Sequence, residues 1–266
     1  DELLAEQAAG TTIGERIFTE TEGNPLFILE VAKMVATSEG RIEDLAIPTR
    51  VVDVVEHRLD RLTQQERDAL EVAAVEGEYF HVGPIATVLE LTRIRTLKLL
   101  QGLERRHRIV RPAEQRFRFD HGKIREIIFN RLAEPLRREY HGVVATCLLA
   151  ERNGTSSAIL AHHLAEAGDA LAALPERRKA AAEARAVFAN EEALHHLGLA
   201  LATLETQAAP DAADLSRAEI RLEMAEVHLL TGSYATAEEL FGRVVREAAT
   251  AGAGTLTARA LLGQGE

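Results

Sequence analysis

Apolar residues recur at helical spacing along most of the chain, and strand-like alternation replaces that spacing in only one stretch. The first 46 residues read as two helices, at residues 13–19 and 25–36, followed by a connector that is rich in acidic residues. Pro48 then stands where a helix can begin, and valine and leucine recur three or four residues apart up to Leu62.

Three further helices are predicted between residues 63 and 107. Thr63 and Glu66 form a capping-box pattern, which opens a helix that stops at Gly77. A shorter helix covers residues 81–89. Thr92 caps another that runs to about residue 107. The apolar residues expected to point inward from this last helix are Ile94, Leu97, Leu100 and Leu103.

The alternating stretch comes next. Residues 109–111 and 116–119 each alternate apolar and basic side chains and are joined across residues 112–115. This pattern indicates a β-hairpin with one face in solvent. Three helices, a hairpin and a following helix together predict a winged-helix domain over residues 47–134.

Beyond residue 135 every segment reads as helical, beginning with a helix at residues 136–150. Part of this region has the spacing of a tetratricopeptide repeat (TPR), in which small residues let two helices approach closely. The residues in that spacing are Met224, Ala225, His228, Gly232, Tyr234, Ala237 and Phe241. Weaker copies have Ala181, Phe188, Ala193 and Leu197, and before them Ala161, Gly168 and Ala173. Residues 135–266 therefore predict a TPR-like solenoid, which we expect to continue in a longer protein.

Composition supports a mainly α fold. Apolar residues make up 46% of the chain, yet aromatic residues only 4%, and tryptophan is absent. Alanine and leucine then do the packing, which favours stacked helices over a sandwich or barrel. No apolar run approaches the roughly 20 residues that span a bilayer. With no visible signal peptide and a lone Cys147, a cytoplasmic location is expected.

The net charge of −11 is unevenly distributed. Residues 93–125 carry eleven basic and three acidic side chains, whereas residues 1–92 and 151–266 are predominantly acidic. In a DNA-reading winged helix, such cations would meet the major groove and the backbone. The candidates on this alternative reading are Arg93, Arg95, Lys98, Arg105, Arg106 and Arg116. The acidic remainder, and the lack of aromatic or amide base-readers beside these cations, leave DNA a possible but not a favoured partner.

Two further sites have candidate ligand chemistry. Asn24 can cap a helix that begins at Pro25, and the free amides at its mouth could hold a phosphate or the edge of a base. His121 begins another helix directly after the predicted hairpin. From these residues alone, a simple helix cap and a structural turn residue remain the commoner readings.

Catalytic and metal sites are not predicted. The pairs His162-His163 and His195-His196 consist of adjacent residues, which point about 100° apart on a helix and chelate poorly. We read both pairs as solvated helix faces. No GxxxxGK[ST] phosphate loop, HExxH motif or G-x-S-x-G elbow occurs in the sequence.

Two segments resemble a known family. The run TEGNPLFILEVAK (residues 21–33) resembles the Gly-x-Pro element in the lid of STAND ATPases, the signal-transducing relatives of AAA+ and NB-ARC proteins. The run RFRFDHGKIREIIFNRL (residues 116–132) resembles the wing and following helix of that family's winged-helix domain. NB-ARC members have an Asp after the matching His, where this chain has Gly122, so bacterial STAND members are the closer likeness.

The resemblance implies a regulatory role. It implies that residues 1–46 are a fragment of the ATPase lid, that Gly23 and Pro25 pack near the adenine, and that His121 faces the β-phosphate of bound ADP. ATP or ADP would bind to the intact parent protein, whose N-terminal ATPase core is missing here, and tight binding to this chain is not expected. The TPR face would take a protein or small-molecule inducer. The alternatives are a winged-helix DNA-binding regulator and a TPR protein-interaction scaffold.

Overall fold

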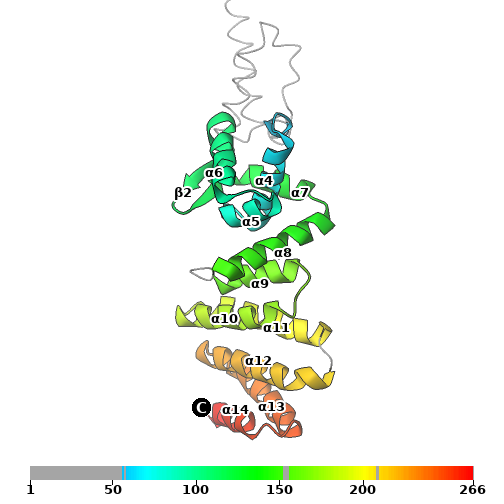
Figure 1. Ribbon diagram of the computed structural model, residues 1–266. Coiled ribbons are helices and arrows are strands. Elements are labelled where there is room, and N and C mark those ends of the chain that lie inside the picture. The colour runs from blue at the N-terminus through cyan, green and yellow to red at the C-terminus, as the bar shows by residue number, and fades with distance from the viewer. Residues whose placement is uncertain (1–55, 57, 152–155, 208–209, 266) are drawn as a thin grey trace, which may run out of the picture. The chain divides into compact units, whose positions relative to one another are not determined.

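The computed structural model describes residues 56, 58–151, 156–207 and 210–265. The fold is mainly α with one small antiparallel sheet, as predicted (Figure 1). The chain folds as two compact units, with the boundary between Leu132 and Ala133. The predicted lid fragment, with Gly23, Asn24 and Pro25, lies outside the described residues.

The first unit has the element order of a winged helix. Its elements are α4 (Gln64–Glu76), β1 (Tyr79–Phe80), α5 (Val82–Val88), α6 (Arg93–Gly102), the π-helical turn η2 (Leu103–His107), β2 (Val110–Ala113), β3 (Arg116–Phe119) and α7 (Gly122–Arg131). The strands β2 and β3 are the two that the alternating pattern predicts. The strand β1 was not predicted.

The helix starts follow from their capping residues. Glu66 N donates to Thr63 Oγ1 at 3.3 Å, and Thr63 N donates to Glu66 Oε2 at 2.9 Å, so the predicted capping box is confirmed. Arg95 N donates to Thr92 Oγ1 at the start of α6. Gly77 ends α4 with a φ of 149°, a conformation that favours glycine.

The sheet has one apolar and one exposed face. Its strand order is β1-β3-β2, with both pairs antiparallel. Because side chains alternate along a strand, Phe80, Phe117 and Phe119 share one face. The ring centroid of Phe80 lies 6.2 Å from that of Phe117 and 5.3 Å from that of Phe119. This aromatic cluster joins the short strand β1 to the hairpin.

The inward face of α6 is narrower than predicted. Leu100 and Leu103 are fully buried, but Ile94 is 68% exposed and Leu97 37% exposed, so the prediction is wrong for these two residues. The buried stripe passes instead through Thr96, Leu100 and Leu103, which are four and three residues apart. At 100° per residue, Ile94 and Leu97 lie well outside that stripe.

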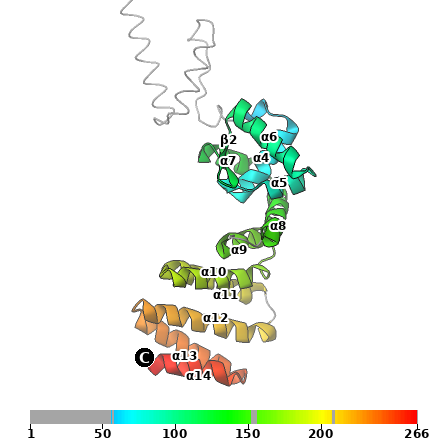
Figure 2. The same ribbon diagram turned by 60° about the vertical axis from the view of Figure 1, so that its left-hand side comes forward.

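The second unit is a series of helices in which each packs against the next (Figures 1 and 2). The helices are α8 (Glu134–Glu151), α9 (Ser157–Glu166), α10 (Ala173–Ala186), α11 (Asn190–Gln207), α12 (Pro210–Leu230), α13 (Tyr234–Thr250) and α14 (Gly254–Gly265). Fully buried alanines lie between neighbours, such as Ala193 between α10 and α11 and Ala237 between α12 and α13. The helices therefore pack in sequential pairs like a repeat array.

Four of the turns between these helices use a left-handed residue. Gly168, Gly232 and Gly252 have φ values of 87°, 75° and 69°, and glycine adopts this region without strain. The α10–α11 turn has Phe188 there instead, at a φ of 60°. This side chain is 87% exposed, so little packing offsets the strained backbone.

One histidine differs from its prediction. His163 is buried rather than solvated, and its Nδ1 lies 2.8 Å from Nδ1 of the equally buried His141 on α8. The adjacent His162 is exposed, because neighbouring residues on a helix point in different directions. For this hydrogen bond one ring must donate and the other accept, so at least one of the two is neutral.

In the described part of the chain, no helix combines the length and apolarity needed to cross a membrane.

Candidate functional site: the basic face of the wing sheet

The strand register gathers basic side chains on the sheet face opposite the phenylalanines. Arg118 pairs with Tyr79 on one side and with Arg111 on the other, and Arg116 pairs with Ala113. Residues directly opposite each other in an antiparallel pair point to the same face. We call Tyr79, Arg111, Arg116 and Arg118 the wing face.

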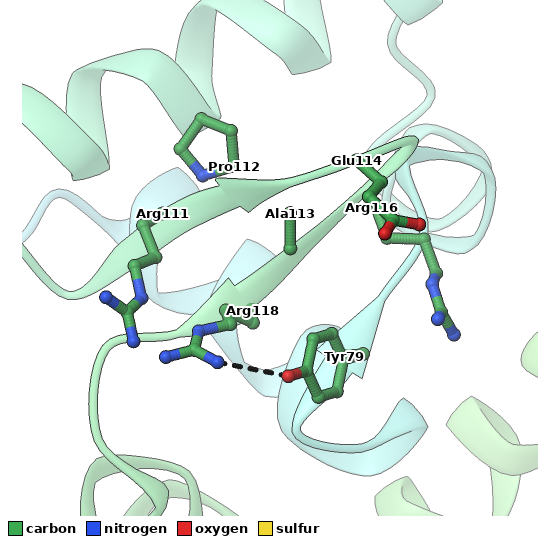
Figure 3. A pocket seen from close by; sticks show the side chains of 7 residues that line it. All are labelled: Tyr79, Arg111, Pro112, Ala113, Glu114, Arg116 and Arg118. Atoms are coloured by element: carbon green, nitrogen blue, oxygen red, sulfur yellow. Dashed lines mark hydrogen bonds between the residues drawn. The ribbon is translucent and has the colours of Figure 1, made fainter.

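Tyr79 holds two of the arginines in place. Arg118 Nη1 donates a hydrogen bond to the Tyr79 hydroxyl at 3.0 Å, drawn as a dashed line in Figure 3. The Cζ atoms of Arg116 and Arg118 lie 5.4 and 5.8 Å from the Tyr79 ring centroid, within the range of cation–π attraction. In Figure 3, the Arg111 and Arg118 side chains lie on the same side of the hairpin, whereas Pro112 points the opposite way.

The wing face surrounds an open hollow of about 510 Å³. The residues that line it are Tyr79, Arg111, Pro112, Ala113, Glu114, Arg116 and Arg118 (Figure 3). Arg111 Nε lies 3.6 Å from Asp120 Oδ1. Within the described residues, Arg116 and Arg118 have no carboxylate within ion-pair distance. The hollow is therefore bordered by positive charge that Asp120 and Glu114 only partly offset.

His121 lies beside this face, at the start of α7. Its Nε2 is 3.4 Å from Asp120 Oδ2, so Asp120 lies close to both Arg111 and His121. The backbone of His121 is extended, and its side chain makes no capping hydrogen bond to α7. The ring is partly exposed. It is thus placed at a helix N-terminus without being used to cap it.

The other predicted cations are distributed over three elements. Arg93, Arg95 and Lys98 are exposed on α6, and Arg105 is exposed on η2. Of the six residues in the DNA reading, only Arg116 lies on the wing face.

Arg106 belongs to a structural contact. Its Nη2 donates to Glu66 Oε1 at 2.8 Å, joining η2 to the start of α4. Burial alone would raise the pKa of Glu66. However, hydrogen bonds from the Thr63 amide and hydroxyl, with the charges of Arg106 and His107, hold that pKa below its ordinary value. Glu66 is therefore ionised at neutral pH and anchors Arg106.

Sequence reasoning placed Arg111, Arg116 and Arg118 among the cations of the predicted hairpin, but it missed Tyr79. The sequence also predicted no aromatic or amide base-reader beside these arginines; Tyr79 is an aromatic residue beside them, but guanidinium groups lie over its ring. The signal that could have found Tyr79 is the exposed–buried alternation of Tyr79 and Phe80 just after the glycine that ends α4. Two residues are too short a run to indicate a strand without its partner.

The second unit has a candidate partner surface of its own, on alternate helices. Arg178 on α10 pairs with Glu219 at 3.0 Å and with Glu223, both on α12. Glu226 on α12 lies 3.5 Å from Arg185 on α10 and 2.7 Å from Arg259 on α14. An open hollow of about 330 Å³ adjoins these charges and is lined by Arg185, Glu226, Leu229, Leu230, Phe241, Arg259, Leu262 and Gly263.

This second surface combines apolar and charged groups. Leu230 and Leu262 are both strongly exposed beside the hollow. Across the described ranges, no cluster of three or more His, Cys, Asp or Glu side chains has the arrangement of a metal site.

Comparison with known proteins finds only a distant similarity. No protein-family model and no curated protein sequence matches it. Among solved structures, it is similar to a Signal Transduction ATPase with Numerous Domains (STAND) protein with a tetratricopeptide repeat sensor from Pyrococcus horikoshii, at 15% identity and a TM-score of 0.38. The similarity covers 88% of this chain and 38% of that protein, so the chain spans less than half of its length. A likeness this distant assigns no function.

Proposed function

We propose that the chain is the regulatory part of a STAND-type signalling ATPase or transcription regulator. In this proposal an ATPase core elsewhere in the longer protein binds ATP or ADP. Gly23, Asn24, Pro25 and His121 face that nucleotide. The winged helix then passes the nucleotide state to the repeat array, which binds a protein or small-molecule inducer.

The position of His121 is the observation that carries the proposal. An imidazole that begins a helix, is partly exposed and does not cap that helix can donate to a phosphate oxygen. His121 also lies at the N-terminus of α7, an end of a helix that favours a bound anion. Gly122 leaves this helix start open, since a Cβ added there would meet no atom within 4 Å.

The array supports the second half of the proposal. Its alternate helices α10, α12 and α14 present ion pairs beside an open hollow with exposed leucines. Protein interfaces combine apolar anchors with a polar rim in this way. A partner that binds across these helices would contact several repeats at once.

The test is a His121→Ala change in the longer protein, with basal nucleotide hydrolysis and basal output as the readouts. Losing a contact that holds the resting state should raise both in the absence of inducer. His162→Ala is the matched control, because His162 is also an exposed histidine but lies on α9 in the second unit. Unchanged basal activity in the His121 variant would refute the sensor role. Absence of a phosphate loop upstream in the coding sequence would refute the class.

A further inference from the structure

We infer that the wing face binds the phosphate backbone of a nucleic acid, through Arg111, Arg116 and Arg118 with Tyr79 as their support. The inference concerns the outer face of the sheet rather than α6. It is independent of the proposed nucleotide-sensing role of His121.

The guanidinium groups are held ready for a phosphate. Arg118 is fixed by its 3.0 Å hydrogen bond to the Tyr79 hydroxyl, and Arg116 lies against the same ring. Positioning an arginine before the ligand arrives reduces the conformational entropy that binding must remove. Arginine is also the side chain that best matches phosphate, because two parallel N–H groups can reach two oxygens.

The arrangement is electrostatically unfavourable without an anion. Arg111 and Arg118 are direct cross-strand partners, and like charges in that position destabilise a sheet. Of the three arginines, only Arg111 lies within ion-pair distance of a carboxylate of the described residues, Asp120 at 3.6 Å. A bound polyanion would remove this repulsion.

The spread of the cations favours a chain of phosphates over one phosphate group. Arg116 and Arg118 are two positions apart on β3, which separates their Cα atoms by about 7 Å, and Arg111 lies across from Arg118 on β2. The hollow is open and extends over all three strands. Several points of contact along a polymer therefore fit the site better than a single small anion.

The face has little means of reading bases. No Asn or Gln side chain lines the hollow, and guanidinium groups already lie over the Tyr79 ring. Contacts limited to phosphate position a protein on nucleic acid without specifying sequence. We therefore expect binding that ignores sequence and that weakens as the salt concentration rises.

The experiment measures fluorescence anisotropy of a labelled random-sequence DNA duplex with the full chain, over a series of salt concentrations. Arg116→Glu and Arg118→Glu should each weaken binding by about tenfold and lower the slope of log affinity against log salt by about one. Tyr79→Phe removes only the hydrogen bond to Arg118 and should weaken binding by about twofold. Circular dichroism checks that each variant stays folded.

Lys123→Glu is the matched control. It makes the same charge change at an exposed residue on α7, where Lys123 pairs with Glu126, and should leave affinity within about twofold. A second comparison is the double change Arg93→Glu and Arg95→Glu on α6. If this double change abolishes binding while the wing-face variants do not, the site lies on α6 and the inference is wrong.

Two further outcomes would also overturn the inference. The first is absence of duplex binding at low salt. The second is equal competition by polyglutamate of matched charge, which would show that the wing face takes acidic protein segments rather than phosphate. Selective competition by unlabelled DNA supports the inference.

Discussion

Each of the two units of this chain is stabilised by its own internal contacts, and these contacts differ in the sequence separation of the residues that they join. In the first unit, residues far apart in sequence meet: Arg118 and Tyr79 are 39 positions apart, Arg106 and Glu66 are 40 apart, and Arg125 donates to the Ala74 carbonyl 51 positions away. In the second unit, each helix packs mainly on the helix before and after it. Damage should therefore spread through the whole first unit but stay local in the second.

The ion pairs between alternate helices do not remove this contrast. Arg185, Glu226 and Arg259 link α10, α12 and α14, but Arg259 is exposed and the other two are only partly buried, and ion pairs open to solvent contribute little. Arg221 on α12 is buried and pairs with Glu205 on α11 and Glu247 on α13, which are its immediate neighbours. Neighbour contacts thus dominate the second unit.

The most severe test of this contrast compares two buried phenylalanines. Phe119→Ala and Phe241→Ala each remove a fully buried ring, at a cost of about 3–5 kcal/mol. Hydrogen–deuterium exchange should show faster exchange over the whole first unit, α4 to α7, for the Phe119 variant. For the Phe241 variant, faster exchange should be confined to α12, α13 and α14. If hydrogen exchange in the Phe241 variant were equally faster in α8 and α9, the array would unfold as one cooperative unit.

A smaller effect is expected from the buried carboxylate that joins the distant segments of the first unit. Glu66→Gln keeps the shape but removes the charge that accepts from Thr63 and Arg106, so we expect a loss of about 1.5–3 kcal/mol. Because the folded pKa of Glu66 is lowered, its stabilising effect is complete above the unfolded pKa of about 4.5 and is lost as the pH falls below it.

Thermal unfolding between pH 3 and pH 7 checks this prediction. The Glu66→Gln variant should be less stable than the original chain at pH 7, and the difference should shrink as the pH falls. The control is Glu126→Gln, an exposed carboxylate on α7, which should change stability little at any pH. A difference that stays constant down to pH 3 would contradict the role given to the Glu66 charge.

The smallest expected effect lies at a turn of the second unit. Phe188→Gly relieves the left-handed backbone of an exposed residue and should stabilise the α10–α11 pair by about 1 kcal/mol. The reciprocal change Gly232→Ala, at a turn with room for a Cβ, should destabilise by a similar amount. Urea unfolding measures both. A loss of stability in the Phe188 variant would show that contacts of the Phe188 ring stabilise the fold by more than the left-handed backbone costs.

Much of the fold was predictable because local chemistry decides it. The capping box at Thr63, the stop at Gly77 and the cap at Thr92 depend on residues next to one another in sequence. The hairpin is likewise indicated by alternation within about ten residues. The left-handed turns at Gly168 and Gly232 follow from the repeat spacing and from the freedom of glycine.

The candidate site was less predictable because it depends on pairing across the sheet. Tyr79 comes to lie beside Arg118 only through the β1–β3 register, which no local pattern contains. The burial of His163 similarly depends on where His141 on α8 meets α9. Ile94 and Leu97 were misplaced since an apolar residue on a helix need not face the core.

The position of Tyr79 also gives the chain an optical probe at the site of interest. The sequence contains no tryptophan and three tyrosines, of which Tyr79 alone lies in the first unit, with Tyr140 and Tyr234 in the second. Replacing the latter two with phenylalanine would leave Tyr79, hydrogen-bonded to Arg118, as the single tyrosine. With excitation that tyrosine absorbs and phenylalanine does not, the emission of Tyr79 would then report whether this surface is occupied in unlabelled protein.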